Sequence, residues 1–159
     1  MVHDADVETE HQRLERVYRD EAPRLYRALT GYSGDPEVAS DALAEAFAQA
    51  LSRGGEVSSP QAWVWRAAFR IAAGELQRRR RERPGSPESV GEFPEPIDHV
   101  VRALQQISPN QRLAVVLHDY ADRPTDEIAA ILGASRATVH VHLSQGRRRL
   151  RKLLEEADG

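Results

Sequence analysis

The sequence has 159 residues, of which 40% are apolar, and a formal net charge of −3; a chain of this size forms one domain or two small ones. It contains no Cys, which excludes disulfides, thiolate metal sites and thiol redox chemistry. No apolar run approaches the roughly 20 residues of a membrane span, and the acidic N-terminal stretch is unlike a signal peptide, so we expect a cytoplasmic protein without a membrane span.

Charge alternates along the chain. Residues 1–60 carry 12 acidic against 6 basic side chains, whereas 61–83 carry 7 basic against 2 acidic ones. The pattern then repeats, with 6 acidic against 2 basic residues over 84–122 and 7 basic against 2 acidic over 123–152. A single basic island is most simply a solvated face, but two islands in two predicted helices favour two contacts with a polyanion.

The first two helices are predicted from periodicity and capping residues. The first covers 7–32, where apolar residues recur at helical spacing and Pro23 is expected to kink or break the helix. The second begins after Asp35, whose side chain can cap a helix that has Pro36 at its first position.

A loop over 52–59 follows, and a third helix is expected from Pro60 to the arginine run before Pro84. Trp63 and Trp65 lie two residues apart in this helix, so we expect one of them to face the core and the other not. An exposed Trp beside an arginine would offer a stacking platform for unpaired bases. Partial burial of both rings is the other interpretation.

The stretch from Pro84 to Pro96 has four prolines, two glycines, two serines and three glutamates, and no apolar period. This composition predicts an extended, flexible linker. We therefore divide the chain into a helical domain over 1–83, a linker over 84–97 and a second helical domain over 98–159. No segment alternates apolar and polar residues, so the expected fold class is all-α.

Four helices are predicted in the second domain. One covers about 98–106, the next opens at Ser108 and Pro109, and the last two lie in the stretch TDEIAAILGASRATVHVHL. Gly133 is expected to end the first of these two in the left-handed conformation, and Ser135 to cap the second. This spacing is typical of a helix-turn-helix.

The last helix has two different faces. The buried face is predicted to carry Val139, Leu143, Gly146, Leu150 and Leu153. The opposite face is basic and polar and suits a DNA major groove edged by phosphates, although an ordinary helical hairpin with an arginine-rich surface is the alternative. The residues assigned to duplex DNA are Arg136, Thr138, His140, Val141, Ser144, Gln145, Arg147 and Arg148.

Neither a metal site nor an enzyme is expected. His140 and His142 are two residues apart, so on a helix they point about 200° apart and cannot share an ion, and no third ligand is evident. A small hydrolase would need a nucleophile elbow, a phosphate loop or a clustered set of ligands, none of which the sequence contains. No catalytic residue and no cofactor are therefore predicted.

Taken in order, these features resemble the extracytoplasmic-function (ECF) class of RNA polymerase sigma factors. The resemblance covers about 14–154 and includes the motifs DPEVASDALAEAF and AWVWRAAFRIA as well as the helix-turn-helix. It implies that the first domain is similar to sigma region 2, which docks on the clamp of core polymerase and melts the minus-ten promoter element. The second domain is similar to region 4, which reads the minus-thirty-five element.

The resemblance also implies roles for single residues. Asp41, Glu45 and Phe47 match the acidic motif that contacts the polymerase clamp. The loop over 52–59 falls where the family captures a flipped promoter base, which spares the protein from reading a base inside a duplex. The residues assigned to promoter melting and single-stranded DNA are Arg53, Trp63, Trp65, Arg66 and Arg70.

The chain departs from the family pattern at five positions. Ala44 stands where Gln is usual, and Arg70 where Asn is usual. In the recognition helix His140, His142 and Gln145 stand where basic residues are common. These departures imply weaker clamp binding, a non-standard promoter or a loss of initiation activity.

The sequence therefore predicts a non-catalytic, promoter-specifying subunit of bacterial RNA polymerase. Its expected partners are core RNA polymerase, promoter DNA and an anti-sigma factor. The alternative is a sigma-like helix-turn-helix regulator that binds DNA without opening promoters, and the departures at Ala44 and Arg70 motivate it.

Overall fold

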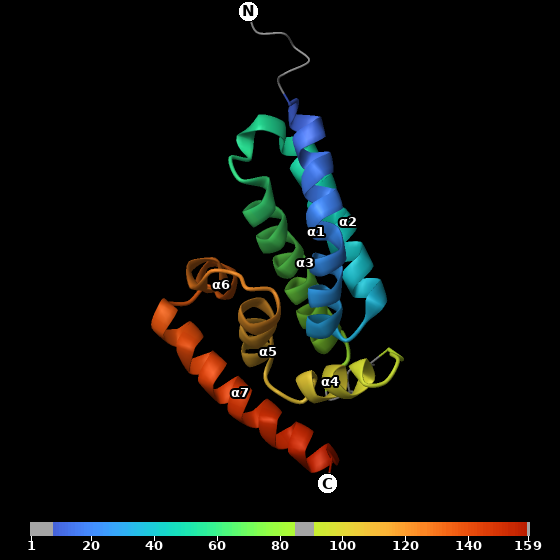
Figure 1. The fold of residues 1–159 in the computed structure, drawn as a ribbon, viewed down its shortest axis with the longest axis vertical. Helices are drawn as coiled ribbons and strands as arrows, with labels where there is room; N and C mark the ends of the chain where they lie inside the picture. Colours follow the sequence, from blue (N-terminus) through green and yellow to red (C-terminus); the bar gives the residue numbers. More distant parts are fainter. Residues whose placement is uncertain (1–7, 85–90, 159) are drawn as a thin grey trace, which may run out of the picture.

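The structure, a computed structural model, describes residues 8–84 and 91–158, and these ranges are built of helices and their connections, without strands (Figure 1). The all-α prediction is thereby confirmed. The helices of the N-terminal half are α1 (Glu10–Ser33), α2 (Pro36–Arg53) and α3 (Pro60–Glu82), with a short 3-10 turn, η2, at Gly54–Glu56. Each of the three helices packs against the other two. No helix in the described ranges combines the length and hydropathy needed to cross a bilayer.

Helix α1 runs without interruption through Pro23. It begins with a capping box, in which the side chains of Thr9 and Gln12 each accept a hydrogen bond from the other's backbone N–H. Pro23 lies on the exposed side of the helix, where water can bond the carbonyl that loses its intrahelical donor, so the expected break does not occur. The helix ends at Gly34, whose φ of 70° is left-handed.

The starts of α2 and α3 are where the sequence predicts them. The side chain of Asp35 accepts a hydrogen bond of 2.9 Å from the backbone N–H of Glu37, and Pro36 occupies the first turn. Pro60 likewise occupies the first turn of α3, but the side chain of Ser59 before it makes no capping hydrogen bond. Small side chains at the contact let the three helices pack closely around Trp65 and Phe69, which are both fully buried.

The predicted linker is described only in part, because residues 85–90 lie outside the described residues. The segment 91–96 contains no helix, in agreement with its composition. Its first residue, Gly91, donates a backbone hydrogen bond of 2.9 Å to the carbonyl oxygen of Gly34. This part of the chain therefore follows the surface of the N-terminal half instead of running free through solvent.

The C-terminal half contains the helices α4 (Ile97–Leu104), α5 (Pro109–Val115), α6 (Thr125–Leu132) and α7 (Arg136–Asp158), with a π-helical turn, η3, at Val116–Tyr120. Ser108 and Gln111 form a second capping box at the start of α5. The helices agree with the predicted ranges to within a few residues. The π-helical turn was not predicted, because its widened hydrogen-bonding pattern depends on packing rather than on residue type.

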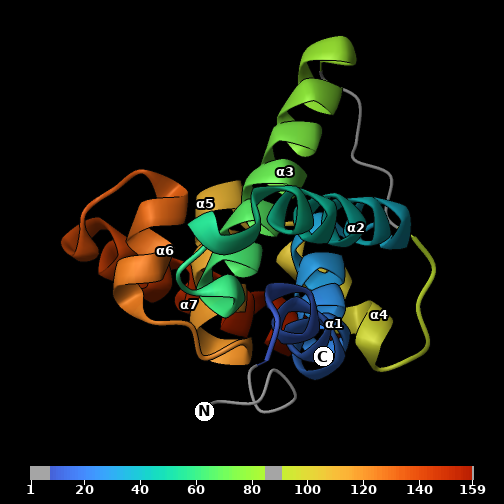
Figure 2. The same cartoon turned by 90° about the horizontal axis from the view of Figure 1, so that it is seen from above.

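The two halves share one continuous core, and α6 lies beside α3 in both views of the fold (Figures 1 and 2). Arg112 on α5 lies at the contact between the two halves, called the joint below, and is only 2% exposed. Its guanidinium donates hydrogen bonds to the carbonyl oxygens of Leu104 at 3.0 Å, Tyr32 at 3.0 Å and Ile107 at 3.4 Å. A buried guanidinium is tolerated only when its donors are satisfied, and here part of that satisfaction comes from α1 in the other half.

Two exposed contacts extend the joint along α1. Arg24 forms an ion pair of 3.0 Å with Asp122, and the Nε of Arg27 donates a hydrogen bond of 2.9 Å to the hydroxyl of Tyr120. Asp122 has a φ of 53°, an unusual value for a residue other than glycine. The connection between η3 and α6 is thus shaped to reach α1.

Candidate nucleic-acid interface

The helix-turn-helix forms through the local features that predict it. Gly133 has a φ of 67° and ends α6, and the backbone N–H of Thr138 donates a 3.1 Å hydrogen bond to the Ser135 hydroxyl, which caps α7. Val139 and Leu143 lie on the buried side of α7. A Cβ at Gly146 would lie 3.0 Å from Val115 on α5, so this glycine lets the two helices approach closely.

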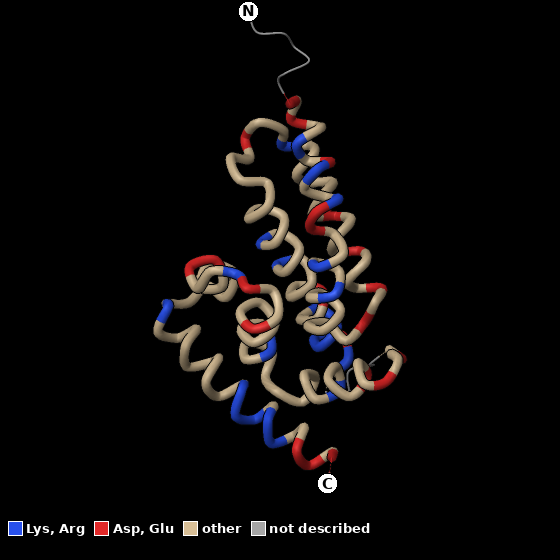
Figure 3. The backbone as a smooth tube through the Cα atoms, in the orientation of Figure 1, with Lys and Arg blue, Asp and Glu red and all other residues tan. Residues whose placement is uncertain are grey.

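The solvent-facing side of α7 brings together the residues predicted to contact duplex DNA. All eight are exposed: Arg136, Thr138, His140, Val141, Ser144, Gln145, Arg147 and Arg148. Figure 3 shows the basic positions at the start of α7 and again along its second half. A helix with one packed face and one basic, polar face has the form of helices that enter a major groove.

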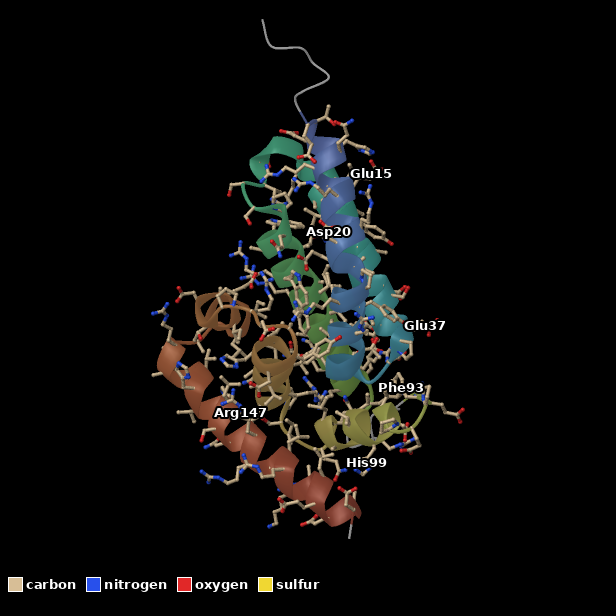
Figure 4. All side chains as sticks on the ribbon, in the orientation of Figure 1. Glu15, Asp20, Glu37, Phe93, His99 and Arg147 are labelled. Atoms are coloured by element: carbon tan, nitrogen blue, oxygen red, sulfur yellow. The ribbon has the colours of Figure 1, made fainter. Side chains whose placement is uncertain are left out.

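Two of these arginines are held by acidic side chains of the same half. Arg136 forms an ion pair with Asp126 at the start of α6. Arg147, labelled in Figure 4, forms two hydrogen bonds with Asp119 of η3, one of them 2.8 Å long from its Nε. The hydrogen bond from Arg147 holds the pKa of the Asp119 carboxyl below its ordinary value, although burial opposes this effect. Both arginines are therefore paired before any DNA is present.

The two histidines of α7 differ in environment. His140 is exposed, whereas His142 is partly buried and its Nδ1 atom has no hydrogen-bond partner. Among the described residues no three His, Cys, Asp or Glu side chains converge on a point where a metal ion would bind. His140 is therefore placed to meet DNA from the exposed face, and His142 is not.

Trp63 and Trp65 differ as expected, since Trp63 is partly exposed and Trp65 is fully buried. The indole N–H of Trp65 donates a 3.1 Å hydrogen bond to Glu21, and the guanidinium of Arg123 lies 5.0 Å from the ring centre. The assignment of Trp65 to single-stranded DNA therefore needs correction for this arrangement, because the C-terminal half covers the ring. Trp63 stays accessible, with the Arg53 guanidinium 5.7 Å from its ring.

Arg66 and Arg70 lie one turn apart on α3. Arg66 is partly exposed and lies about one turn after Trp63 on the same helix. Arg70 donates a 3.2 Å hydrogen bond to the carbonyl oxygen of Ala130 on α6. This departure from the family pattern thus takes part in the contact between the two halves, while the residue as a whole stays exposed.

The loop after α2 borders a cavity of about 260 Å³. Its walls come from the first turns of α1, the end of α2, the loop itself and Pro60. Arg13 on α1 donates a 2.8 Å hydrogen bond to the carbonyl oxygen of Ser58 and so fixes the loop against α1. Sequence reasoning did not find the contribution of α1, because nothing in the local sequence indicates which distant helix will lie beside a loop.

The acidic face of α2 carries Asp41 and Glu45, which are both exposed and lie one turn apart. Phe47, assigned to the same contact, is only 8% exposed and lies edge-on to Tyr18 at 4.9 Å between ring centres. It therefore supports the surface from beneath, which corrects its assignment as a direct contact. Beside Ala44 a hollow of about 570 Å³ separates α2 from α3.

Comparison with known proteins shows that the chain is similar to sigma factors. Residues 98–150 match the family model described as sigma-70, region 4. The chain is 29% identical over 156 residues to the ECF RNA polymerase sigma factor SigE of Mycolicibacterium smegmatis, with 88% of this chain and 61% of that protein covered. It is 27% identical over 160 residues to the RNA polymerase sigma factor CarQ of Myxococcus xanthus, with 91% of each protein covered. The chain is thus similar to ECF sigma factors over most of its length.

Two solved structures have the same fold. The sigma factor RpoE of Bartonella quintana, determined in complex with the anti-sigma factor NepR, superposes with a TM-score of 0.76 at 25% identity and covers 91% of this chain and 96% of its own. CnrH, determined in complex with the cytosolic domain of CnrY, has a TM-score of 0.72 at 20% identity, covering 94% and 91%.

Some relatives are considerably longer than this chain. The chain spans 61% of the length of SigE. It spans 43% of the ECF sigma factor SigJ of Mycobacterium tuberculosis, to which it is 30% identical over 138 residues that make up 76% of this chain.

Proposed function

We propose that this protein directs promoter recognition and transcription initiation as a non-catalytic subunit of bacterial RNA polymerase. One observation carries the proposal: a single chain presents an exposed basic recognition helix, a second arginine and tryptophan surface beside a cavity, and a separate acidic helix face. Two nucleic-acid surfaces with different chemistry suit a protein that reads duplex DNA at one place and unpaired DNA at another. Core polymerase supplies the catalysis in the cytoplasm.

The exposed face of α7 is assigned to the duplex. Gln145 is suited to bidentate contact with adenine, and Arg147 and Arg148 are suited to the phosphate backbone. Arg136 and Thr138 lie at the N-terminal end of the helix, where recognition helices contact base edges. His140, Val141 and Ser144 complete the surface.

Arg53, Trp63 and Arg66 are assigned to the unpaired strand. A guanidinium beside an accessible indole combines charge for the phosphates with a stacking surface for the bases. Movement of the C-terminal half away from α3 would release Arg70 from its hydrogen bond to α6 and remove Arg123 from one side of the Trp65 ring, because both residues contact that half. We infer that polymerase binding separates the two halves.

The acidic face of α2 is assigned to the polymerase clamp. Asp41 and Glu45 present paired negative charge, which favours a basic partner surface. The Ala44 side chain is a methyl group and cannot hydrogen-bond to a partner across the adjacent hollow, so a side chain of the partner must fill that space if the interface is to be dry. An anti-sigma factor is a further expected partner, because the similar sigma factor RpoE was determined in complex with the anti-sigma factor NepR.

A DNA-binding regulator that does not open promoters is the second candidate. The observation that favours this candidate is that the C-terminal half packs against α3, where Trp65 is fully buried and Arg70 is hydrogen-bonded to α6. A protein that kept this arrangement permanently would retain its recognition helix but have no complete surface for unpaired DNA.

The deciding experiment compares Asp41→Lys with Glu45→Lys, in one double variant, against a control double variant with the same change of charge on α1, Glu15→Lys with Asp20→Lys. The α2 variant should lose association with core polymerase and yield no run-off transcript, whereas the control should retain both. Wild-type protein with core enzyme should make promoter thymines reactive to permanganate. DNA binding by the wild type without association or strand opening would instead establish the regulator.

A further inference from the structure

A cavity of about 640 Å³, the α1–α4 cavity, lies where the end of α1 meets α4, and these helices are neighbours in both views of the fold (Figures 1 and 2). Its volume is within the roughly 300–1,000 Å³ of cavities that hold small molecules. Helix α1 and the first residue of α2 form one wall, and the segment 93–96, α4 and η3 form the other. The described residues that line it belong neither to the two DNA surfaces nor to the acidic face of α2.

The lining of the α1–α4 cavity is almost entirely apolar. Ile97 and Val100 of α4 are 54% and 42% exposed, which are high values for aliphatic side chains, and both line the cavity. Leu104 continues the same wall and is buried. A concave apolar surface that water reaches favours an apolar ligand, because covering it removes apolar area from water.

The end of the linker holds one side of the cavity in place. The backbone N–H of Gly91 donates its hydrogen bond to Gly34, and a Cβ at Gly91 would lie 3.0 Å from Pro36 and 3.5 Å from the tip of the Phe93 ring. Pro36 and Phe93 both line the cavity, and Phe93 is labelled in Figure 4. This wall is therefore formed before any ligand arrives, which lowers the ordering cost of binding.

Arg27 is the one charged residue among the described residues that line the cavity. Its Nε is bonded to the hydroxyl of Tyr120, which also lines the cavity. Arg24, one turn earlier, is paired with Asp122, but within the ranges 8–84 and 91–158 no acidic side chain pairs with Arg27. Because Arg27 and Tyr120 are exposed, the free charge lies where the cavity meets solvent. The charge at this position favours an anion.

We propose that the α1–α4 cavity binds a small amphiphile with an anionic head group and an apolar chain, of the fatty-carboxylate class. The head group pairs with Arg27, and the chain covers Ile97 and Val100. A ligand in this position contacts both halves of the chain, so it stabilises their joined arrangement. Binding does not depend on the proposed function. A resulting loss of polymerase association does rest on it, through the separation of the halves that polymerase binding requires.

Titration calorimetry of the full chain with monomeric hexanoate, octanoate and decanoate tests the apolar part of the site. Affinity should rise about fourfold for each added methylene group, the factor expected when the group is fully buried. Decyltrimethylammonium has a chain of the same kind and the opposite charge, and it should bind about tenfold more weakly than decanoate because it cannot accept hydrogen bonds from Arg27. Equal affinity for the two head groups, or no dependence on chain length, would overturn the proposal.

Two variants locate the site. Arg27→Glu should reverse the preference between decanoate and decyltrimethylammonium, whereas Arg19→Glu, with the same change of charge on α1 outside the cavity, should match the wild type. Gly31→Leu tests the cavity without a change of charge. A Cβ at Gly31 lies 3.8 Å from Leu104, an ordinary contact distance, so the larger side chain occupies the cavity and should abolish binding with helical circular dichroism retained. An Arg27→Glu protein that still preferred decanoate would show that the ligand binds elsewhere.

The same probes separate the source of the ligand from its effect. Co-sedimentation of the wild type and Arg19→Glu, but not of Arg27→Glu, with phosphatidylglycerol vesicles would identify a membrane lipid as the source, and no co-sedimentation would identify a free carboxylate. Decanoate should lower the association of the wild type with core polymerase, and an unchanged association would contradict the stabilisation of the joined halves. Failure of the proposed function would look different, since core polymerase would not associate even without decanoate, while decanoate would still bind.

Discussion

The guanidinium of Arg123 lies 5.0 Å from the centre of the Trp65 ring and at the same time forms a 2.6 Å ion pair with Glu127. The two charged side chains are only 13% and 8% exposed. An arginine of the C-terminal half thus covers the tryptophan of the N-terminal half that the family resemblance assigns to promoter DNA. Burial of the Arg123 guanidinium over the ring is tolerated because its charge is paired with Glu127.

Replacing this arginine should loosen the contact between the halves. Arg123→Ala leaves the Glu127 carboxylate buried without its partner and exposes the Trp65 ring, so we expect a loss of about 3 kcal/mol in the free energy of unfolding. In a Trp63→Phe background the tryptophan emission should shift to the red. Arg19→Ala, at an exposed position of α1, serves as the control. Unchanged emission would show that Arg123 does not cover the ring in solution.

The pairing of Arg147 with Asp119 should restrain DNA binding. Asp119→Asn removes a negative charge that competes with DNA phosphates for the guanidinium, so affinity for random duplex should rise several-fold. The plot of log affinity against log salt should become steeper by about 0.9, which corresponds to one more phosphate contact. Fluorescence anisotropy at several salt concentrations measures both quantities. A weaker affinity would mean that Asp119 orients Arg147 toward the DNA.

The same pair gives a prediction for pH. Because the pKa of Asp119 is lower in the folded protein than in the unfolded chain, its contribution to stability is complete above the unfolded value of about 3.9 and disappears as the pH falls through the lowered one. The pair is more than a third exposed, so the contribution should not exceed about 1 kcal/mol. Urea unfolding of wild type and Asp119→Asn should therefore differ at pH 5, and converge below about pH 4. A difference that changed between pH 6 and pH 8 would point to another titrating group.

Specificity and affinity should separate along α7. Gln145→Ala is expected to cost roughly 1 to 3 kcal/mol at one base position and to change little on random DNA. Arg148→Ala should weaken binding to all sequences and flatten the salt dependence. Competition between the promoter and a scrambled duplex distinguishes the two effects. Equal losses for Gln145→Ala on both duplexes would contradict its role.

Cutting the chain in its linker should leave the halves folded and associated. A protease site placed between Pro84 and Gly91 would cut outside every described helix, while the shared core around Arg112 should hold the fragments together. Both fragments should retain helical circular dichroism and elute together in size-exclusion chromatography. Unfolding of the C-terminal fragment would contradict the division into two domains.

Sequence was sufficient where a single residue type decides the local backbone. Gly133 and Asp35 each act through their own conformation or side chain, so the turn and the helix start could be predicted without any tertiary information. Pro23 shows the limit of such reasoning, since packing around α1 outweighs the cost of one missing donor.

The candidate site was harder to predict for the same reason. The partners of Trp65 and the α1 wall of the cavity come from segments far away in the chain, and no local pattern specifies which segments will meet. Residue types indicated that DNA is contacted, whereas the structure shows which of those residues are accessible in this arrangement.

The buried Arg112 holds the C-terminal half against the end of α1. It therefore lowers the affinity of any partner that binds only when the two halves are apart. Tyr32 belongs to the last turn of α1, where carbonyl groups lack intrahelical donors, and Arg112 supplies one across the joint. Separating the two halves exchanges this bond for water and exposes the apolar core that they share, and both changes disfavour the separated form of the free chain. A ligand that binds only that form has its apparent affinity reduced by the fraction of molecules that are open. Two weak ligands that both require opening would then bind cooperatively without touching each other, since the first removes the penalty for the second.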